Sequence, residues 1–296
     1  MFSQYFGSFL LDRQLLTVEQ LKEVLRHVGS ARVMLGVSAI NAGLMTPEQV
    51  ERVHCKQKQT DMKFGKLAVE SGYLSPEGLE YLLSMQKKDH LLLAQAVIDK
   101  KFMTLQELEM AFHLYREEND LTQAQFNSLQ QGDTDEIVRM LLRFDNGAMQ
   151  KKYQEYVSLF IRNIIRFVDK DVLFEKEQDV SGCRVQRLIS QEIKGEVNLH
   201  TGIALDEPDL LKIGGRYAGR AFDRPDCGAE DALAEFLNLQ NGIFLVNMSD
   251  RGTELQLRPQ KVSSGAALTR ISDGYAVPFS LPFCRFTLVL SGEALG

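Results

Sequence analysis

The sequence predicts an α+β protein in two parts, an all-helical repeat domain followed by a domain of helices packed on one face of an antiparallel sheet. Three observations support this division. A 29-residue pattern recurs four times before residue 116, a different alternation of helices and β-like runs begins at Tyr153, and 296 residues exceed the usual length of one compact domain. We therefore predict repeats over 1–116, a helical connector over 117–152 and a second domain over 153–296.

The composition limits the classes of function. A hydrophobic fraction of 44% allows a core to form without disulfides or structural metals. The net charge of -6 argues against a nucleic-acid partner, since that binding needs a basic face. The four cysteines show no metal-ligand spacing and fit a reducing compartment. With no signal-peptide pattern and no apolar run of membrane-spanning length, we expect a cytoplasmic protein without membrane insertion.

Each repeat begins at an apolar anchor, and successive anchors lie 29 residues apart. The anchors are Phe6, Leu35, Phe64 and Leu93, and glycine follows the first three. Eleven residues beyond each anchor stands a hydroxyl residue that is suited to cap a helix: Thr17, Thr46, Ser75 and Thr104. Three of these have a capping-box partner three residues later, namely Gln20, Gln49 and Glu107. The pattern predicts four helix-loop-helix units.

These units resemble the N-terminal domain of the type II secretion and type IV pilus ATPases. The third repeat matches that family's motif best, at Lys63, Phe64, Gly65, Val69, Gly72, Leu79, Leu83 and Gln86. In the family, tandem copies can bind cyclic di-GMP. The family's leading arginine, whose planar fork suits guanine and phosphate, is replaced here by Tyr5, Met34, Lys63 and Leu92. We therefore expect a helical scaffold that does not bind cyclic di-GMP, and a cyclic-dinucleotide sensor is the alternative.

The remaining elements follow in order along the chain. In the connector, residues 137–144 carry an apolar stripe that should dock on a neighbour. An amphipathic helix is expected over 153–168 and further helices from Pro208 and over 231–246. Strand-like runs are expected at 172–177, 183–193, 196–205, 253–259, 266–272 and 283–291. Helices and antiparallel strands in this order predict the α+β second domain.

One helix of this domain carries a narrow polar stripe. At 100° per residue, Asp231, Glu235, Asn238 and Gly242 fall within about 60° of one another. Leu233, Leu237 and Phe244 lie on the opposite side and should face the sheet. A polar helix face is most often only solvated. Asn238 is nevertheless a poor choice for a helix interior, and Gly242 leaves room for a close approach.

The spacing D-x3-E-x2-N, formed here by Asp231, Glu235 and Asn238, resembles the active helix of the CheX, CheC and FliY chemotaxis phosphatases. The likeness extends over about residues 153–294 and includes the order of elements. It implies hydrolysis of the aspartyl phosphate of a CheY-like response regulator. In that scheme Asn238 positions the attacking water and Glu235 pairs with the regulator's lysine. Asp231 is expected to have a supporting role in that scheme, and Gly242, on the same face of the helix, is expected to support the site by leaving room for the partner.

The resemblance also implies what the chain binds. No cofactor or metal is expected on this chain, because the magnesium belongs to the partner regulator. Some family members carry the triplet on two helices, but the nearest register on the first helix, Lys151, Glu155 and Ser158, lacks the amide, so one site is expected. A homodimer is a further implication. Two alternatives stay open: a non-catalytic adaptor that binds a regulator, and a regulator that responds to a cyclic dinucleotide through the repeats.

Overall fold

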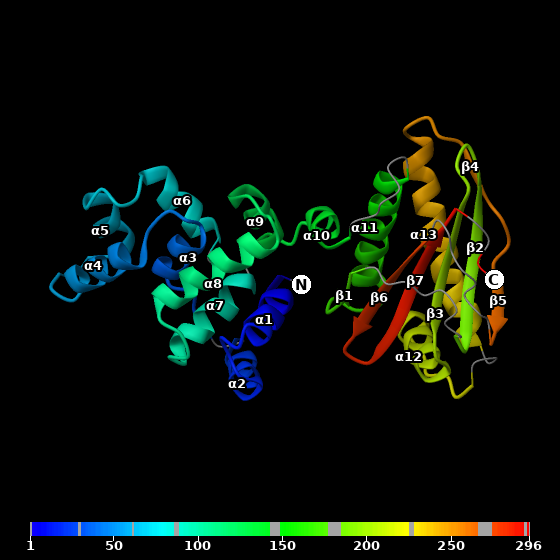
Figure 1. Cartoon of the computed structure of the whole chain (residues 1–296), viewed down its shortest axis with the longest axis horizontal. Helices are drawn as coiled ribbons and strands as arrows, with labels where there is room; N and C mark the ends of the chain where they lie inside the picture. The colour runs from blue at the N-terminus through cyan, green and yellow to red at the C-terminus, as the bar shows by residue number, and fades with distance from the viewer. Residues whose placement is uncertain are drawn as a thin grey trace. The chain divides into compact units, whose positions relative to one another are not determined.

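The computed structural model describes residues 2–28, 31–60, 62–85, 89–142, 149–176, 185–224, 228–265, 274–292 and 295. The chain forms two compact units, Met1–Asp133 and Thr134–Gly296 (Figure 1). The division falls inside the segment 117–152, which the sequence predicts to be a connector.

In the part of the first unit that the structure describes, every regular element is a helix. Its helices are α1 (Phe2–Asp12), α2 (Val18–Val28), α3 (Leu35–Asn41), α4 (Pro47–Gln57), α5 (Phe64–Glu70), α6 (Pro76–Met85), α7 (Asp89–Asp99), α8 (Leu105–Glu118) and α9 (Gln123–Gln130). The first eight form four pairs, one for each predicted repeat. The helix-loop-helix prediction is therefore confirmed for all four repeats.

The four pairs share one backbone conformation at their turns. The residue eight positions after each anchor has a positive φ: Gln14 (56°), Gly43 (66°), Gly72 (70°) and Lys101 (58°). The hydroxyl three residues later then caps the second helix of the pair. Capping boxes form at Thr17, Thr46 and Thr104, and Ser75 accepts a hydrogen bond from the backbone N–H of Gly78. The repeat is thus a local structure set by a left-handed residue and a cap.

Two of the glycines that follow the anchors allow close packing of helices. A Cβ atom on Gly36 would lie 2.6 Å from a side-chain carbon of Val50, and one on Gly65 would lie 2.6 Å from a side-chain carbon of Leu79. Both distances are shorter than carbon atoms tolerate. The close contacts agree with the interpretation of the repeats as a packed scaffold.

The unit continues past residue 116 because α9 is packed into it. The ring of Phe126 is buried and contacts Phe2 and Phe112, with ring centroids 5.6 and 5.7 Å apart. The buried amides of Asn41 and Gln130 also hydrogen-bond to each other, which ties α9 to the second pair. These contacts explain why the compact unit ends at Asp133.

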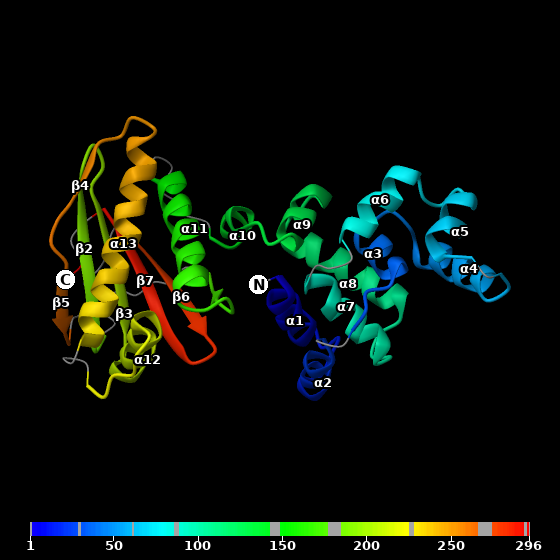
Figure 2. The ribbon, with the colours of Figure 1, turned by 180° about the vertical axis from the view of Figure 1, so that it is seen from behind.

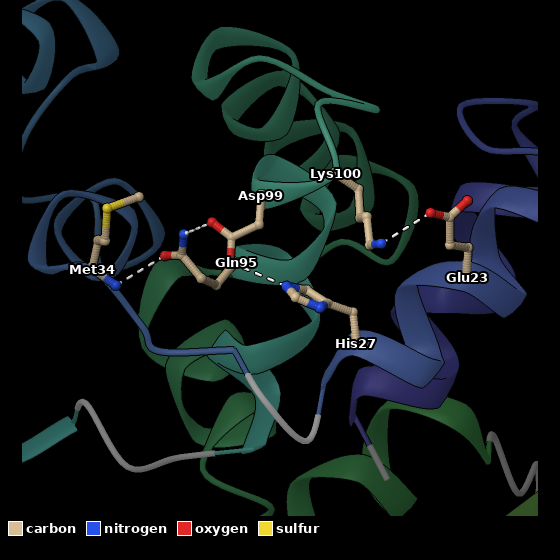
Figure 3. A network of polar contacts seen from close by, with 6 residues as sticks. All are labelled: Glu23, His27, Met34, Gln95, Asp99 and Lys100. Atoms are coloured by element: carbon tan, nitrogen blue, oxygen red, sulfur yellow. Dashed lines mark hydrogen bonds and ion pairs between the residues drawn. The ribbon is translucent and has the colours of Figure 1, made fainter.

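A buried amide connects three of the helix pairs (Figure 3). Gln95 on α7 accepts a hydrogen bond of 2.9 Å from the backbone N–H of Met34 and donates one of 2.8 Å to Asp99. The other oxygen of Asp99 lies 3.7 Å from Nε2 of His27 on α2. Gln95 therefore joins the start of α3 to the contact between α2 and α7.

Among its described residues, the second unit contains a seven-stranded antiparallel sheet. Its strands are β1 (Leu173–Phe174), β2 (Arg187–Gly195), β3 (Leu199–Leu205), β4 (Leu255–Leu257), β5 (Lys261–Ser264), β6 (Gly274–Leu281) and β7 (Cys284–Ser291). Their order is β1-β6-β7-β3-β2-β4, and β5 also pairs with β2. Strand β2 therefore has β3 on one side and both β4 and β5 on the other.

The helices described in this unit are α10 (Thr134–Leu141), α11 (Gln150–Phe167), α12 (Glu207–Ala218) and α13 (Glu230–Ser249). The buried ring of Phe160 on α11 contacts Phe279 and Phe286 of the sheet and also Phe236 on α13. The two long helices therefore lie on the same face of the sheet, as Figure 2 shows. The α+β prediction, with helices on one face of an antiparallel sheet, is confirmed.

The second unit differs from the sequence prediction in two of its strands and agrees with it at α10. Of the apolar stripe predicted at 137–144, residues 137–142 are described, and Ile137 and Val138 on α10 are buried beside α11. Strands β5 and β6 were not predicted, and β6 contains Pro278, a residue that normally argues against a strand interior. The predicted strand-like run at 266–272 lies outside the described residues.

Candidate functional site

Helix α13 presents the polar stripe to solvent. Asp231, Glu235 and Asn238 are exposed, and Gly242 is half-buried. A Cβ atom on Gly242 would have no neighbour within 4 Å, so the helix surface is open at this point. Leu233, Leu237 and Phe244 are buried on the opposite side. The predicted division of the helix into a solvent face and a sheet face is confirmed.

Salt bridges fix the beginning of α13. Arg187 on β2 pairs with Glu230 in the first turn of α13 at 3.0 Å and with Glu207 at the start of α12 at 2.6 Å. The guanidinium is only partly exposed and its two carboxylate partners come from different helices. The site helix is therefore anchored directly to the sheet.

The carboxylate of Glu235 has no cation at ion-pair distance among the described residues. Its neighbour on α12 is Tyr217, whose ring packs edge-on against Phe236 with centroids 5.4 Å apart. Burial, with the nearby charge of Glu235 as a smaller cause, raises the pKa of Tyr217 above its ordinary value. Glu235 is thus an exposed carboxylate beside the aromatic ring of Tyr217, and it can accept a charge-assisted hydrogen bond from a cation of another molecule.

The amide of Asn238 is held in place even though the side chain is exposed. Its Oδ1 accepts a hydrogen bond of 2.8 Å from Nε2 of Gln191, which is buried on β2. An exposed asparagine without such a partner would sample several rotamers. One end of the amide is therefore fixed by the sheet, and the other is left to solvent.

A buried polar network continues from Gln191 into the space between the helices. Asn241 donates hydrogen bonds to Oε1 of Gln191 (2.8 Å) and to Oγ1 of Thr201 (2.9 Å). It also accepts a hydrogen bond of 2.6 Å from the hydroxyl of Tyr156. A separate pair, Asn163 to Gln240 at 2.7 Å, lies nearby between α11 and α13. The helices that carry and support the site are thus joined by satisfied polar groups.

Sequence reasoning missed Gln191 and Tyr217. Gln191 had a usable signal, because it alternates with Ile189 and Ile193 on the buried face of a strand. A polar side chain at such a position needs partners. Tyr217 had no comparable signal, since its approach to Glu235 depends on how α12 folds back on α13.

Helix α11 does not repeat the arrangement of carboxylate and amide found on α13. Lys151, Glu155 and Ser158 do share one face of α11, where they line a hollow of about 640 Å³ with residues of α10 and α13. Glu155 is paired with Arg251 at 2.6 Å, and Ser158 is only 2% exposed. In this register a buried serine stands where α13 has the amide of Asn238, and the carboxylate already has a cation partner.

The described residues contain no group of three or more His, Cys, Asp or Glu side chains arranged to hold a metal ion. None of the helices in the described part of the chain is long and apolar enough to cross a membrane.

The chain is similar to solved structures of chemotaxis proteins. They include a CheC-like superfamily protein from Shewanella sp. PV-4 (17% identity, TM-score 0.41, 46% of this chain and 93% of that chain) and CheX from Vibrio vulnificus (17% identity, TM-score 0.39, 46% and 98%). A third is the CheX–CheY–BeF3–Mg2+ complex from Borrelia burgdorferi (16% identity, TM-score 0.41, 50% and 98%). No protein-family model matches the sequence, and no curated protein matches it. The resemblance of the repeats to pilus ATPases stays a prediction.

Proposed function

We propose that this protein is a phosphatase that hydrolyses the aspartyl phosphate of a CheY-type response regulator, with Glu235 and Asn238 as its working residues. The observation that carries the proposal is that two side chains lie one helical turn apart on the solvent face of α13: a carboxylate with no cation partner among the described residues, and an amide oriented by a hydrogen bond. The D-x3-E-x2-N spacing supports it. Open space at Gly242 supports it too, because a visiting protein must come close to this helix.

The proposed reaction is an attack of water on phosphorus. The bond between phosphorus and the regulator's aspartate breaks, which releases inorganic phosphate and restores the carboxylate. Most of the catalysis in such a displacement comes from placing the water in line and stabilising charge. Asn238 would enter the regulator's site and place that water. Its amide neither gains nor loses a proton, so it acts by position and not as a base.

Glu235 would dock the regulator. A free carboxylate on a rigid helix suits an ion pair with a lysine of the partner. This contact would fix the angle at which Asn238 enters. The magnesium ion of the reaction would stay with the regulator, and this chain would supply no metal ligand.

An adaptor that binds a regulator without hydrolysing its phosphate is the competing function. Docking alone would use the carboxylate but would not need an oriented amide one turn further along. The buried glutamine that holds Asn238 favours the catalytic alternative.

The test is a dephosphorylation assay. CheY-type regulators encoded by the source organism are purified, phosphorylated with acetyl phosphate and mixed with the full chain. The wild type should speed the loss of phosphate, and Asn238→Ala should abolish the effect while it leaves regulator binding intact. Binding without faster decay would identify an adaptor, and unchanged decay across all regulators, with no binding, would refute both functions.

A further inference from the structure

Gln191 holds Asn238 from beneath, although the two residues are 47 positions apart in the chain. Gln191 lies in the middle of β2, is 4% exposed, and places Nε2 at 2.8 Å from Oδ1 of Asn238. We propose that Gln191 is a positioning residue for the dephosphorylation reaction, acting through Asn238. This inference rests on the proposed function for its catalytic meaning, but the orientation itself is a property of the free protein.

The backbone decides which way the amides point. Nε2 of Gln191 lies 2.9 Å from the carbonyl oxygen of Arg258. A carbonyl oxygen can only accept, so the atom of Gln191 that faces it is the nitrogen. The atom of Asn238 that lies 2.8 Å from the same nitrogen must then be an acceptor. Oδ1 of Asn238 therefore points inward and its Nδ2 points outward.

The other end of Gln191 is fixed in the same way. Its Oε1 accepts from Nδ2 of Asn241, which also donates to Thr201. Both Nε2 protons of Gln191 and its oxygen are thus engaged, and a flipped amide would place like atoms together at three contacts. In a buried site such a flip is expensive, because each lost bond leaves an unsatisfied group. Gln191 therefore has one orientation.

The functional consequence concerns the free atoms of Asn238. The outward Nδ2 offers two N–H donors, and Oδ1 keeps one lone pair beside its bond to Gln191. An oxygen of the phosphoryl group or of the attacking water would therefore find an N–H donor already in place. The Asn238 side chain would not have to change rotamer first. Holding a reacting partner in this way lowers the barrier to the chemical step, so the effect belongs in kcat.

The kinetic arm of the test uses Gln191→Met, which keeps the side-chain length and removes the hydrogen bonds. We expect kcat to fall about tenfold while KM changes by less than about twofold, because docking through Glu235 is unaffected. Thr201→Val is the matched control, since it removes a bond to Asn241 in the same network but none to Asn238. An unchanged kcat, a change in KM alone, or an equal fall in both variants would overturn the proposal.

The second arm needs no regulator. Nitrogen-15 NMR of the full chain identifies the Asn238 side-chain amide as the pair of signals that Asn238→Ala removes. In the wild type this group should show restricted motion together with rapid exchange of its protons with water, and Gln191→Met should make it mobile. A mobile amide in the wild type, or protons as protected as those of Asn241, would overturn the positioning role. If the wild type has no phosphatase activity but the amide behaves as expected, the proposed reaction fails and the positioning of Asn238 by Gln191 stands.

Discussion

The hydroxyl of Tyr156 donates a hydrogen bond of 2.6 Å to Oδ1 of Asn241, and both side chains are fully buried between α11 and α13. Burial raises the pKa of Tyr156 far above its ordinary value, so the hydroxyl stays protonated and remains a donor. Asn241 in turn donates to Gln191, which holds Asn238. One chain of hydrogen bonds thus runs from Tyr156 on α11, through Gln191 on β2, to the exposed amide of Asn238.

Tyr156→Phe should destabilise the second unit. The substitution removes the donor and leaves Oδ1 of Asn241 buried without this partner, at a cost of about 1–3 kcal/mol. Urea unfolding followed by circular dichroism measures the loss. Tyr217→Phe is the control, because the hydroxyl of Tyr217 forms no hydrogen bond among the described residues. Equal effects of the two substitutions would contradict a structural role for the buried bond.

Glu235→Gln should weaken docking of the regulator more than it slows the chemistry. The substitution removes the charge from an exposed side chain, so the free energy of unfolding should change by less than about 0.5 kcal/mol. We expect KM for the phosphorylated regulator to rise about tenfold, with kcat reduced much less. Steady-state dephosphorylation over a range of regulator concentrations separates the two constants. Asp231→Asn, which removes a charge one turn earlier on the same helix, should have a smaller effect, and a loss of kcat alone in Glu235→Gln would assign Glu235 to the chemistry.

The sequence predicted the repeats well because their signals are local. An anchor, a left-handed residue and a cap recur at fixed spacing, and each acts within a few residues. The solvent face of α13 was also predictable from periodicity alone. The extent of the first unit was not, because it depends on Phe126 and Gln130 packing against residues more than 85 positions away. Contacts between residues so far apart in the chain produce no periodic pattern in the sequence.

The support of the site was harder to predict than the site itself. Gln191 meets Asn238 only because β2 lies beneath α13, and the register of the sheet places it there. Strand β6 was missed because Pro278 lies in it, and β5 because KVSS has no alternation of apolar residues. Polar residues at positions where the pattern predicts burial, here Gln191, Gln240 and Asn241, are the sequence signal for such support, because buried polar groups need partners.

Lys101→Gly should stabilise the first unit. Lys101 has a φ of 58°, a conformation that is unfavourable for a residue with a side chain, and the side chain is exposed. Relief of the strain should exceed the added entropy of the unfolded chain and raise the free energy of unfolding by up to about 1 kcal/mol.

The equivalent position in the third repeat supplies the opposite change. Gly72 has a φ of 70°, and a Cβ atom there would meet nothing within 4 Å, so Gly72→Ala tests the backbone alone. We expect a loss of about 1 kcal/mol. Thermal unfolding of both variants checks the pair, and changes of the same sign would contradict the shared left-handed turn.

Cyclic di-GMP should not bind the repeats. The positions that carry the arginine in the resembling family are Tyr5, Met34, Lys63 and Leu92, and only Lys63 is cationic. Lys63 is exposed at the start of α5, but an ammonium lacks the planar fork that pairs with phosphate and stacks on guanine. Titration calorimetry of the full chain should show no saturable heat up to about 100 µM ligand, a range that would detect micromolar affinity. A saturable isotherm that Lys63→Ala removes would instead identify a nucleotide sensor.

The stability of the first unit should fall as the pH drops below neutrality, and His54 should contribute to the fall. His54 is half-buried, with its ring 5.0 Å from that of Phe64, and burial is the main cause that lowers its pKa. Below about pH 6.5 the unfolded chain takes up a proton that the folded chain resists, so protonation favours unfolding until His54 also titrates in the folded state. His54→Gln removes this titratable group. The free energy of unfolding of the variant should therefore fall less between about pH 7.5 and pH 5.5 than that of the wild type. These two pH values lie about one unit either side of the ordinary histidine pKa. Urea unfolding of both proteins at the two pH values measures the difference, and identical losses would show that His54 has the same pKa in the folded and unfolded states.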